Sequence, residues 1–550
     1  MVDYRRDAES NHSEDRNFDP RTPGGDLDGE YRDFFDGKIY QRYLRRVKGL
    51  FKDHRSILLH LSMDGVPIIR EGKPKSVTPV LLQILNLPPW LRQKRRNMIL
   101  SMIIPGDPPE IACWLKPLWR ELQILSKGVW AIDGAMKRDV EEGALHYETD
   151  YQFKLQAWMV IAVGDQVAMC KLCGMKGAGS KHGCRRCWMT GTRIPGSRNK
   201  LYYYPHHGAT GRQPERTNFE EIARMAGMSK HDSVQKEVGV NAVSPLLDLP
   251  NQSVFFTRAI PYGIMHMIPI GITKLMFSIW RGVLPTEQQP ANRDPASGVP
   301  WSPPPFVIDE FWSDFGNELV NSASTLPAAL GDAPMNINTQ RTGYTAHQLH
   351  NFILLYSVPL LSGRLPEEYL QHWITFVRAY EMLMSWTMNN EIVNEMEVLF
   401  AEWVEGYERM YVQHVNDGYD TVTGYYQVAA TSADRMAWMT SNVHALLHLA
   451  DQVRDCGPAF NMAEWCIERY CGYLKPHAKS RQMPEESLMY AAESEEMVKL
   501  VDIACPWLGL KRIIEEMDPP ELHNHGYETK YGFLLPKVCV VKNVFLNGHH

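Results

Sequence analysis

Short apolar runs that end at turn residues fill the first part of the chain and predict β-strands. The first run is Ile57 to Leu61, and it leads into Ser-Met-Asp64-Gly, a turn signal. Further runs of strand length lie at 66–69, 77–85, 98–104 and 155–163. Residues 111–126 instead carry leucines at helical spacing. The pattern predicts several strands, one helix and a last strand, with Asp64 closing the first strand and Asp165 following the last.

The later part of the chain has the periodicity of amphipathic helices. It follows a segment, 285–305, that contains seven prolines and predicts a linker or an irregular excursion. The helical patterns lie at 311–322, 346–361, 367–387, 392–413 and 435–453. They predict an α/β core that is interrupted by a large, mostly helical insertion. The predicted divisions are a flexible acidic arm with a lead-in helix (1–50), the first part of the core (51–205), the insertion (206–430), a helical return segment (431–500) and a C-terminal tail (501–550).

Composition restricts the class of protein without identifying it. Of 550 residues, 44% are hydrophobic and 22% are charged, as expected of a globular protein with several domains. The apolar runs are too short to cross a membrane, and the first thirty residues lack the apolar stretch of a secretory signal. We therefore expect no membrane association. In a reducing compartment, the closely spaced cysteines predict metal ligands rather than disulfides.

The charge is unevenly distributed along the chain. The net charge of −6 carries no overall nucleic-acid signature. Ten Lys/Arg and two Asp/Glu lie between Asp165 and Arg216. A second basic cluster without an acid inside it consists of Arg469, Lys475, Lys479 and Arg481. Charge alone favours two solvated surfaces over a nucleic-acid-binding surface.

Two Cys-x-x-Cys motifs, Cys170–Cys173 and Cys184–Cys187, are candidates for zinc. Together they could form a four-cysteine ribbon, and the glycines between them suit a backbone that turns tightly around an ion. His444 and His448 lie four residues apart in a helical pattern and share one face of the helix. The two imidazoles could therefore complete the ligand set of one Cys pair. Ala445 stands where a zinc protease needs glutamate, which excludes that class.

Three acids are candidates for a divalent-cation site. Asp64 and Asp165 follow strands, a position where aspartate is often only a turn former or a helix cap. Glu468 lies in a cation-rich amphipathic helix and would be ordinary if it stood alone. If the fold brings the three together, their carboxylates could hold two Mg²⁺ ions about 4 Å apart for phosphodiester chemistry.

Taken together, these residues resemble the DDE transposases, and most closely the CACTA (En/Spm) type and its fungal Plavaka relatives. The segments that carry the resemblance occur in the expected order between about residues 50 and 500. They are 58–68, 82–89, 164–177, 184–187, 261–266, 444–451 and 467–472. The resemblance implies an RNase H-like core with a mixed sheet flanked by helices.

The resemblance also implies the roles of individual residues. Asp64, Asp165 and Glu468 would be the catalytic acids, and they would bind two Mg²⁺ or Mn²⁺ ions. The spacing is similar to that in the catalytic subunit of the V(D)J recombinase and its Transib relatives, where a Cys pair and a His pair share one zinc. This layout implies one structural Zn²⁺ on Cys184, Cys187, His444 and His448 and is preferred to the four-cysteine ribbon.

The implied partner is DNA, at transposon ends and at target sites. The basic residues near the acids would contact its backbone: Arg185, Arg186, Arg469, Lys475, Lys479 and Arg481. The resemblance further implies a nuclear protein that acts as a homodimer or a larger assembly.

The chain departs from the family pattern in one segment. The pattern places an acid at Gly263 and an acid–amide pair near Ile270 and Gly271, and this chain has neither. Two other interpretations therefore stand beside an active nuclease and strand transferase. One is a catalytically impaired or domesticated transposase-derived DNA-binding or scaffold protein. The other, less favoured, is an unrelated zinc-ribbon protein.

Overall fold

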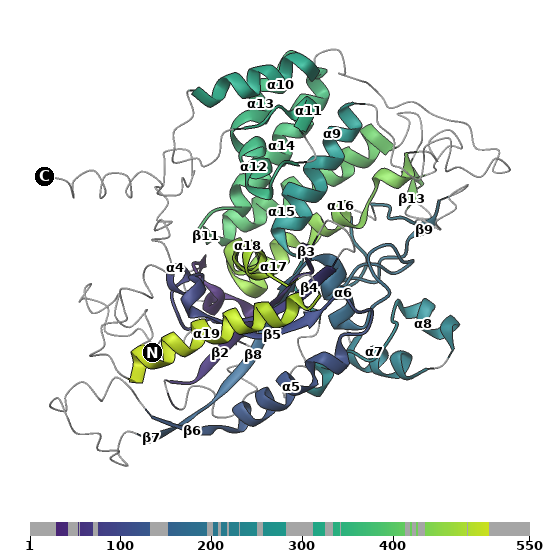
Figure 1. Ribbon diagram of the computed structural model, residues 1–550. Helices are drawn as coiled ribbons and strands as arrows, with labels where there is room; N and C mark the ends of the chain where they lie inside the picture. Colours follow the sequence, from purple (N-terminus) through teal and green to yellow (C-terminus); the bar gives the residue numbers. More distant parts are fainter. Residues whose placement is uncertain are drawn as a thin grey trace, which may run out of the picture.

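The computed structural model describes most of the chain between residues 29 and 504 (Figure 1). The described residues are 29–41, 53, 55–69, 75–132, 152–194, 202–206, 211–216, 219–229, 231–249, 257–281, 312–324, 334–340, 343–412, 419–420, 425–426, 435–480 and 482–504. The predicted Pro-rich segment 285–305, most of the predicted tail and Arg481 lie outside them.

A mixed five-stranded sheet forms the centre of the first part of the chain. Its strands are β2 (Ile57–Met63), β3 (Val66–Ile69), β4 (Lys75–Ile84), β5 (Met98–Pro105) and β8 (Ala157–Gly164). β4 lies antiparallel to β5 on one side and antiparallel to β2 and β3 on the other, whereas β8 lies parallel to β2. The expectation of a mixed sheet in an α/β fold is confirmed.

β2 and β3 continue each other along the same edge of β4 and are separated by Asp64 and Gly65. Both pair with β4 in the same register, with Met63 opposite Val80 and Val66 opposite Val77. The register carried through the gap puts Pro79 opposite Asp64. Proline has no N–H for the ladder, so it favours an interruption at this point. Asp64 is thereby released from the ladder at the end of β2.

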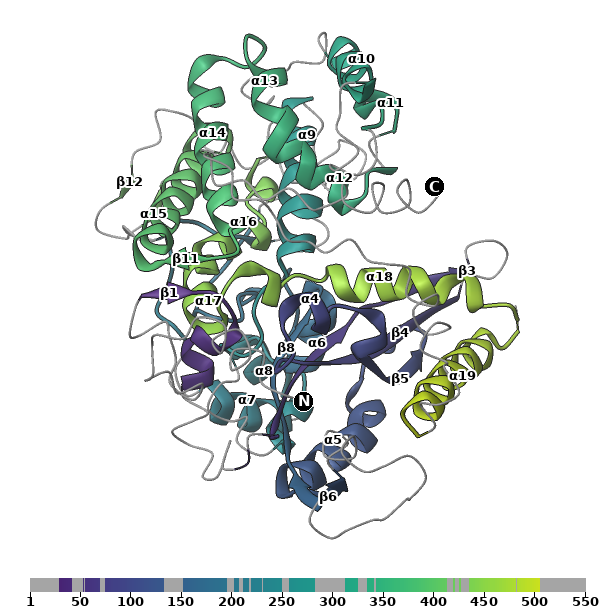
Figure 2. The same ribbon diagram turned by 90° about the vertical axis from the view of Figure 1, so that its left-hand side faces the viewer.

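Helices cover both faces of this sheet (Figure 2). On one face, α5 (Ala112–Lys127) and α6 (Gln166–Cys173) pack on alternate residues of β2, β4 and β8. On the other, α18 (Trp465–Leu474) and α19 (Pro484–Ala504) pack on β3, β4 and β5. The burial of Ile467, Cys471 and Leu474 on the sheet fixes which face of α18 points away from it.

The helical part lies on one side of the sheet region in both views (Figures 1 and 2). At its centre the helices α14 (Glu367–Leu383) and α15 (Asn390–Tyr407) pack against each other, and their buried faces are rich in aromatic residues. Inside it the Phe376 ring stacks on Trp373 and makes a tilted contact with Trp403. A π-helix, η8 (His266–Thr273), continues into α9 (Lys274–Trp280) and connects this block with the sheet region.

The remaining elements lie around these two parts. The other strands are β1 (Glu30–Tyr31), β6 (Val129–Ile132), β7 (Gln152–Leu155), β9 (Thr192–Arg193), β10 (Tyr202–Tyr203), β11 (Met388–Asn389), β12 (Tyr419–Asp420) and β13 (Tyr425–Tyr426). The other α-helices are α4 (Pro89–Arg92), α7 (Phe219–Met228), α8 (Asp232–Val238), α10 (Trp312–Asn321), α11 (Ile337–Gln340), α12 (Ala346–Asn351), α13 (Ser357–Leu361), α16 (Ser441–Ala445) and α17 (Leu449–Cys456). π-helical turns η16 (Phe352–Tyr356) and η17 (Glu408–Val412) extend α12 and α15.

Residues 29–41 are the described part of the predicted acidic arm and lead-in helix. Residues 29–41 are packed against the rest of the protein, with Phe34 and Ile39 buried. Asp33 accepts two hydrogen bonds from the Arg92 guanidinium, at 2.8 and 2.6 Å, and both side chains are buried. The aromatic residues of this segment outweigh its acidity, because their burial and the buried ion pair offset the entropy of ordering it.

Candidate active site and metal centre

Asp64 and Asp165 stand at the same end of two neighbouring parallel strands. In the β2–β8 register Met63 lies beside Gly164, so the next residues on the two strands are the two aspartates. A Cβ at Gly164 would come within 2.4 Å of the Met63 carbonyl oxygen. Glycine is therefore required where the strands approach each other just before the acids.

Asp165 also caps a helix. One of its carboxylate oxygens, Oδ1, accepts a hydrogen bond of 2.6 Å from the Ala168 amide at the start of α6. This is the ordinary role of aspartate at a strand-to-helix turn. It holds the side chain in place and uses one of the two oxygens, so the cap and a cation-binding role are compatible.

Glu468 reaches the same edge from α18. It lies in the first turn of the helix, and its amide donates a hydrogen bond to the carbonyl oxygen of Glu464, the residue just before the helix. The structure brings Asp64 and Glu468 together with a third side chain, His266, so that one donor atom of each lies within 4.8 Å of the others. His266 Nε2 is 3.2 Å from Glu468 Oε1 and 3.9 Å from Asp64 Oδ2. Asp165 interacts electrostatically with Asp64 but is not a member of this close group.

The electrostatics of this group follow from its burial. Burial, with smaller contributions from Glu468 and Asp165, raises the pKa of Asp64 to about 7, although His266 acts to lower it. Burial by itself would lower the pKa of His266, but Glu468, Glu464 and Asp64 raise it to about 9. Contact with that imidazole lowers the pKa of Glu468. The acids therefore stabilise positive charge at this place, whether it is a proton on the His266 imidazole or a bound cation.

Glu464 is a further acid that sequence reasoning missed. Its side chain is buried, and Oε2 accepts a hydrogen bond of 2.9 Å from the Met265 amide, while Oε1 has no hydrogen-bond partner. A Cβ built on Gly263 would lie 1.5 Å from Oε1. The Glu464 carboxylate thus occupies the space of a side chain at 263, where the family pattern places an acid.

Gly271 shows the same relationship with Asn442 of α16. A Cβ at Gly271 would lie 2.4 Å from the Asn442 amide nitrogen. The family pattern places an amide side chain near this position. In both cases a side chain of the same chemical kind enters from the return segment and fills the space above a glycine.

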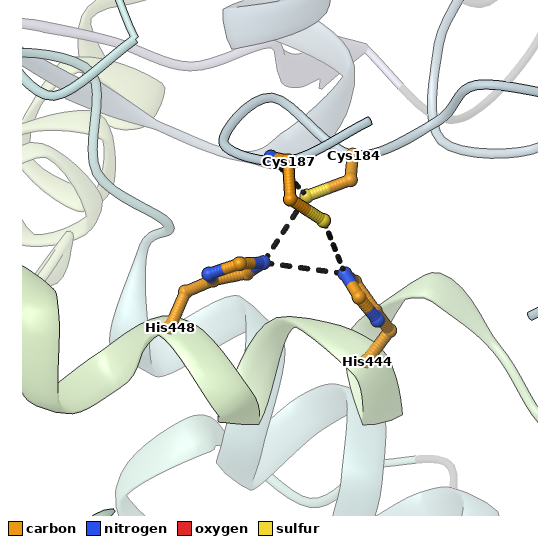
Figure 3. Close-up of side chains that lie close together, drawn as sticks. All are labelled: Cys184, Cys187, His444 and His448. Atoms are coloured by element: carbon orange, nitrogen blue, oxygen red, sulfur yellow. Dashed lines mark hydrogen bonds between the residues drawn. The ribbon is translucent and has the colours of Figure 1, made fainter. Parts of the chain in front are cut away.

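Four side chains form a second close group, between the sheet region and the helical part (Figure 3). Cys184 and Cys187 come from the loop after α6, and His444 and His448 come from the α16–α17 region. Sγ of Cys184 is 3.3 Å from His448 Nε2, Sγ of Cys187 is 3.3 Å from His444 Nε2, and the two Nε2 atoms are 3.2 Å apart. All four residues are buried.

These distances are close to the edges of a zinc tetrahedron. Bonds of about 2.3 Å to sulfur and 2.0–2.1 Å to nitrogen give edges of about 3.4 to 3.8 Å. Cys184 Sγ also accepts hydrogen bonds from the Arg186 amide, the Cys187 amide and the Tyr262 hydroxyl. Although burial raises the pKa of the Cys184 thiol, Cys187 and the two imidazoles bring it well below its usual value. The surroundings of Cys184 are therefore those of a thiolate.

The other Cys pair lies on α6 and does not join this group. Burial raises the pKa of Cys170 and raises the pKa of Cys173 to about 12. Both thiols are neutral at physiological pH. Among the described residues, the close Cys/His group contains Cys184 and Cys187 but neither of these.

Two of the predicted DNA contacts are inside the protein. Arg185 is buried, lies over the Tyr262 ring and donates to the Pro261 carbonyl oxygen. Arg186 is buried and pairs with Asp455 at 2.8 Å. Both guanidinium groups therefore hold the loop that carries the cysteines, and in this arrangement neither is at the surface to reach DNA.

The predicted contacts on and after α18 are at the surface. Arg469, Lys475 and Lys479 are exposed. Lys475 lies two turns after Glu468 and lowers the pKa of that carboxyl. A positive charge is therefore present beside the acids on the solvent side.

The comparisons with known proteins bear on the first part of the chain. Residues 28–213 match the family model described as "Transposase family tnp2". The match supports a transposase, and with it DNA binding. It spans Asp64, Asp165 and the Cys184–Cys187 motif and ends before the segments that contribute His266, His444, His448 and Glu468. No curated protein matches the chain. Within the part of the chain that the structure describes, no helix combines the length and apolar character needed to cross a bilayer.

Proposed function

We propose that this protein is a DDE-type DNA transposase of the CACTA (En/Spm) type, similar to the fungal Plavaka elements, with an RNase H-like core. It would cut DNA at transposon ends and join the resulting 3′-hydroxyl to target DNA. The observation that carries the proposal is the meeting of Asp64 and Glu468, from opposite ends of the chain, at the strand edge where Asp165 stands. The tnp2 match supports the same class of protein.

The acids suit divalent cations. Asp64 is buried, and its pKa is raised to about 7 because burial disfavours its charged form, so a bound cation would stabilise the carboxylate. Mg²⁺ and Mn²⁺ prefer such carboxylate oxygens. Asp64, Asp165 and Glu468 would hold the ions. Two bound ions would activate a water molecule or a 3′-hydroxyl and stabilise the leaving oxygen of the phosphodiester.

The protein's own groups position these acids. The β2–β8 register sets the two aspartates side by side, and the α6 cap fixes the orientation of Asp165. Packing of α18 on the sheet through Ile467 and Cys471 presents Glu468 at the edge. Arg469, Lys475 and Lys479 would contact phosphates of the DNA backbone, which fixes its position without reading its sequence.

One Zn²⁺ on Cys184, Cys187, His444 and His448 belongs to the same proposal. Two backbone amides and a tyrosine hydroxyl already point at Cys184 Sγ, as expected around a metal-bound thiolate. A zinc ion here would tie the return segment to the core only 20 residues before Glu468. Its part would be structural, since four protein ligands leave no position for a substrate.

A homodimer or a larger assembly and a nuclear location are further parts of the proposal. An element has two ends that are cut in concert, which favours more than one active site in the complex.

The direct test is metal-dependent cleavage of DNA. The substrate is a supercoiled plasmid that carries the two genomic flanks of the copy encoding this chain. We expect nicking in Mg²⁺ or Mn²⁺ and none in Asp165→Asn, which keeps the cap on Ala168 but removes the charge. Asp107→Asn, an exposed aspartate outside the site, is the matched control and should cut normally.

The second candidate function is a transposase-derived DNA-binding protein that has lost cleavage. The observation in its favour is the absence of an acid at Gly263 and of the acid–amide pair at 270–271. It predicts that the protein binds the same DNA tightly while neither metal supports nicking. That outcome would replace the first proposal.

A further inference from the structure

We propose that His266 is itself a ligand of the active-site cation, so that the site contains nitrogen as well as oxygen donors and binds Mn²⁺ in preference to Mg²⁺. The inference rests on the proposed function for the roles of Asp64 and Glu468. It goes beyond the carboxylate triad by naming another ligand and the class of metal that it selects.

The geometry places the imidazole among the carboxylates. His266 Nε2 is 3.2 Å from Glu468 Oε1 and 3.9 Å from Asp64 Oδ2, and all three donor atoms fall within one 4.8 Å group. Nε2 is buried and makes no aligned hydrogen bond in the structure. The 3.2 Å distance is that of neighbouring ligands on one ion, since metal–ligand bonds of about 2.0–2.2 Å give edges of about 3 Å. The 3.9 Å distance is longer and would shorten when an ion binds.

The backbone that carries His266 is held independently of any ion. The helix that carries His266 begins at Ile264. The Met265 amide in its first turn donates a hydrogen bond of 2.9 Å to Glu464 Oε2. A carboxylate at a helix N-terminus is favourable. The neighbouring residue, Tyr262, donates its amide to Gln452 Oε1 at 2.7 Å. The return segment thus fixes the position of the histidine.

A buried, unpartnered oxygen also lies beside this site. Glu464 is almost fully buried, at 2% exposure, and its Oε1 has no hydrogen-bond partner. It interacts electrostatically with both His266 and Asp165. A protein rarely leaves a buried carboxylate oxygen without a partner. Burial raises the pKa of Glu464 to about 7, so a divalent ion on Asp64, His266 and Glu468 would stabilise the charged form of this carboxylate.

The donor set decides the metal. Carboxylate oxygens serve Mg²⁺ and Mn²⁺ equally, but an imidazole nitrogen is a poor ligand for Mg²⁺ and a good one for transition metals. Replacing the imidazole should therefore weaken the binding of Mn²⁺ more than that of Mg²⁺. The effect should be about tenfold or more, because even residues that only orient metal ligands change affinity about 10- to 100-fold.

The experiment measures Mn²⁺ bound to the full-length protein that retains its zinc. Pulsed electron paramagnetic resonance detects a nitrogen nucleus bonded to Mn²⁺ by the modulation of the echo. We expect nitrogen modulation in the wild type, and we expect its frequencies to change on ¹⁵N-histidine labelling. His266→Gln should abolish the modulation and weaken Mn²⁺ binding about tenfold, with a smaller change for Mg²⁺. His477→Gln, a half-buried histidine just after α18, is the control and should behave as the wild type.

The outcomes separate this inference from the proposed function. Mn²⁺ that binds through Asp64, as shown by its loss in Asp64→Asn, but gives no nitrogen modulation would overturn the histidine ligand and leave the nuclease intact. Nitrogen modulation without DNA cleavage would support the ligand and overturn the nuclease. The isotope measurement uses wild-type protein, so the inference is tested even if His266→Gln does not fold.

Discussion

Gly263 provides the sharpest test of how the site is built. In Gly263→Ala the added Cβ would lie 1.5 Å from Glu464 Oε1 and 2.2 Å from its Cδ. Both distances are far below van der Waals contact, so the carboxylate must leave and the buried Met265 amide loses its acceptor. Overpacking costs about 1–3 kcal/mol and an unsatisfied buried donor about 1–3 kcal/mol. We expect the free energy of unfolding to fall by about 2 to 5 kcal/mol.

The cost should be largely removed by a second substitution. In Gly263→Ala/Glu464→Ala the methyl group enters space that the carboxylate has vacated. We expect the double variant to be more stable than the sum of the two single effects by about 1–3 kcal/mol. Urea unfolding followed by circular dichroism gives the four free energies of this cycle. Gly472→Ala on α18 is the matched control, because its Cβ would meet nothing within 4 Å and alanine favours a helix.

Two results would refute the reasoning. If Gly263→Ala is as stable as the wild type, the Glu464 carboxylate does not occupy this space in solution. If the two costs simply add, the residues are not in contact. The same pair can be tested for function, because Gly263→Asp/Glu464→Ala returns the acid to the position of the family pattern. We expect it to bind Mn²⁺ while Gly263→Asp alone does not.

Three further predictions concern zinc, pH and DNA. Cys184→Ser should lose the single zinc ion measured by mass spectrometry, whereas Cys173→Ala should keep it; loss in both would favour the four-cysteine ribbon. Burial lowers the pKa of His372 to about 4 from 6.5, so the folded state resists a proton that the unfolded state accepts. The stability that this histidine contributes above pH 6.5 is therefore lost as the pH falls toward 4. In His372→Leu the slope of the unfolding free energy against pH should be smaller in this range by up to about 1.4 kcal/mol per pH unit. Equal slopes in the two proteins would exclude His372 as a cause of the pH dependence. Lys475→Gln should weaken DNA binding and make the slope of log K against log salt concentration less steep by about 0.9. Arg186→Gln should instead lower the melting temperature of the protein. A less steep salt slope in a fully stable Arg186→Gln would show that Arg186 contacts DNA.

The local elements of the fold were predictable because their signals are local. The apolar runs gave the strands of the central sheet to within a few residues, and β2 and β8 run slightly past their predicted ends. The 16-residue α5 and the helices α10, α14 and α15 also lie where the periodicity places them. The positions of Asp64 and Asp165 at strand ends followed directly from these runs.

The direction in which a charged side chain points could not be predicted from the sequence pattern. Arg185 and Arg186 belong to a basic stretch, and charge density alone cannot distinguish a guanidinium that faces DNA from one that pairs inside the protein. The decisive residue for Arg186 is Asp455, far along the chain. The packing of residues 29–41 could not be predicted for the same reason. In the sequence Asp33 is one acid of an acidic stretch, and only the fold shows that it pairs with Arg92.

The two glycines show why the active site could not be judged position by position. The chain lacks an acid at 263 and an amide at 271, yet Glu464 and Asn442 place a carboxylate and an amide over those glycines. A large side chain at either glycine would collide with the group that now stands there, so each pair holds one polar side chain and one glycine. Each polar group thus lies next to the position at which the family pattern places one, although it comes from another segment. An acid that is missing from a motif is therefore weak evidence for an impaired site until the residues that face the motif in the fold are known.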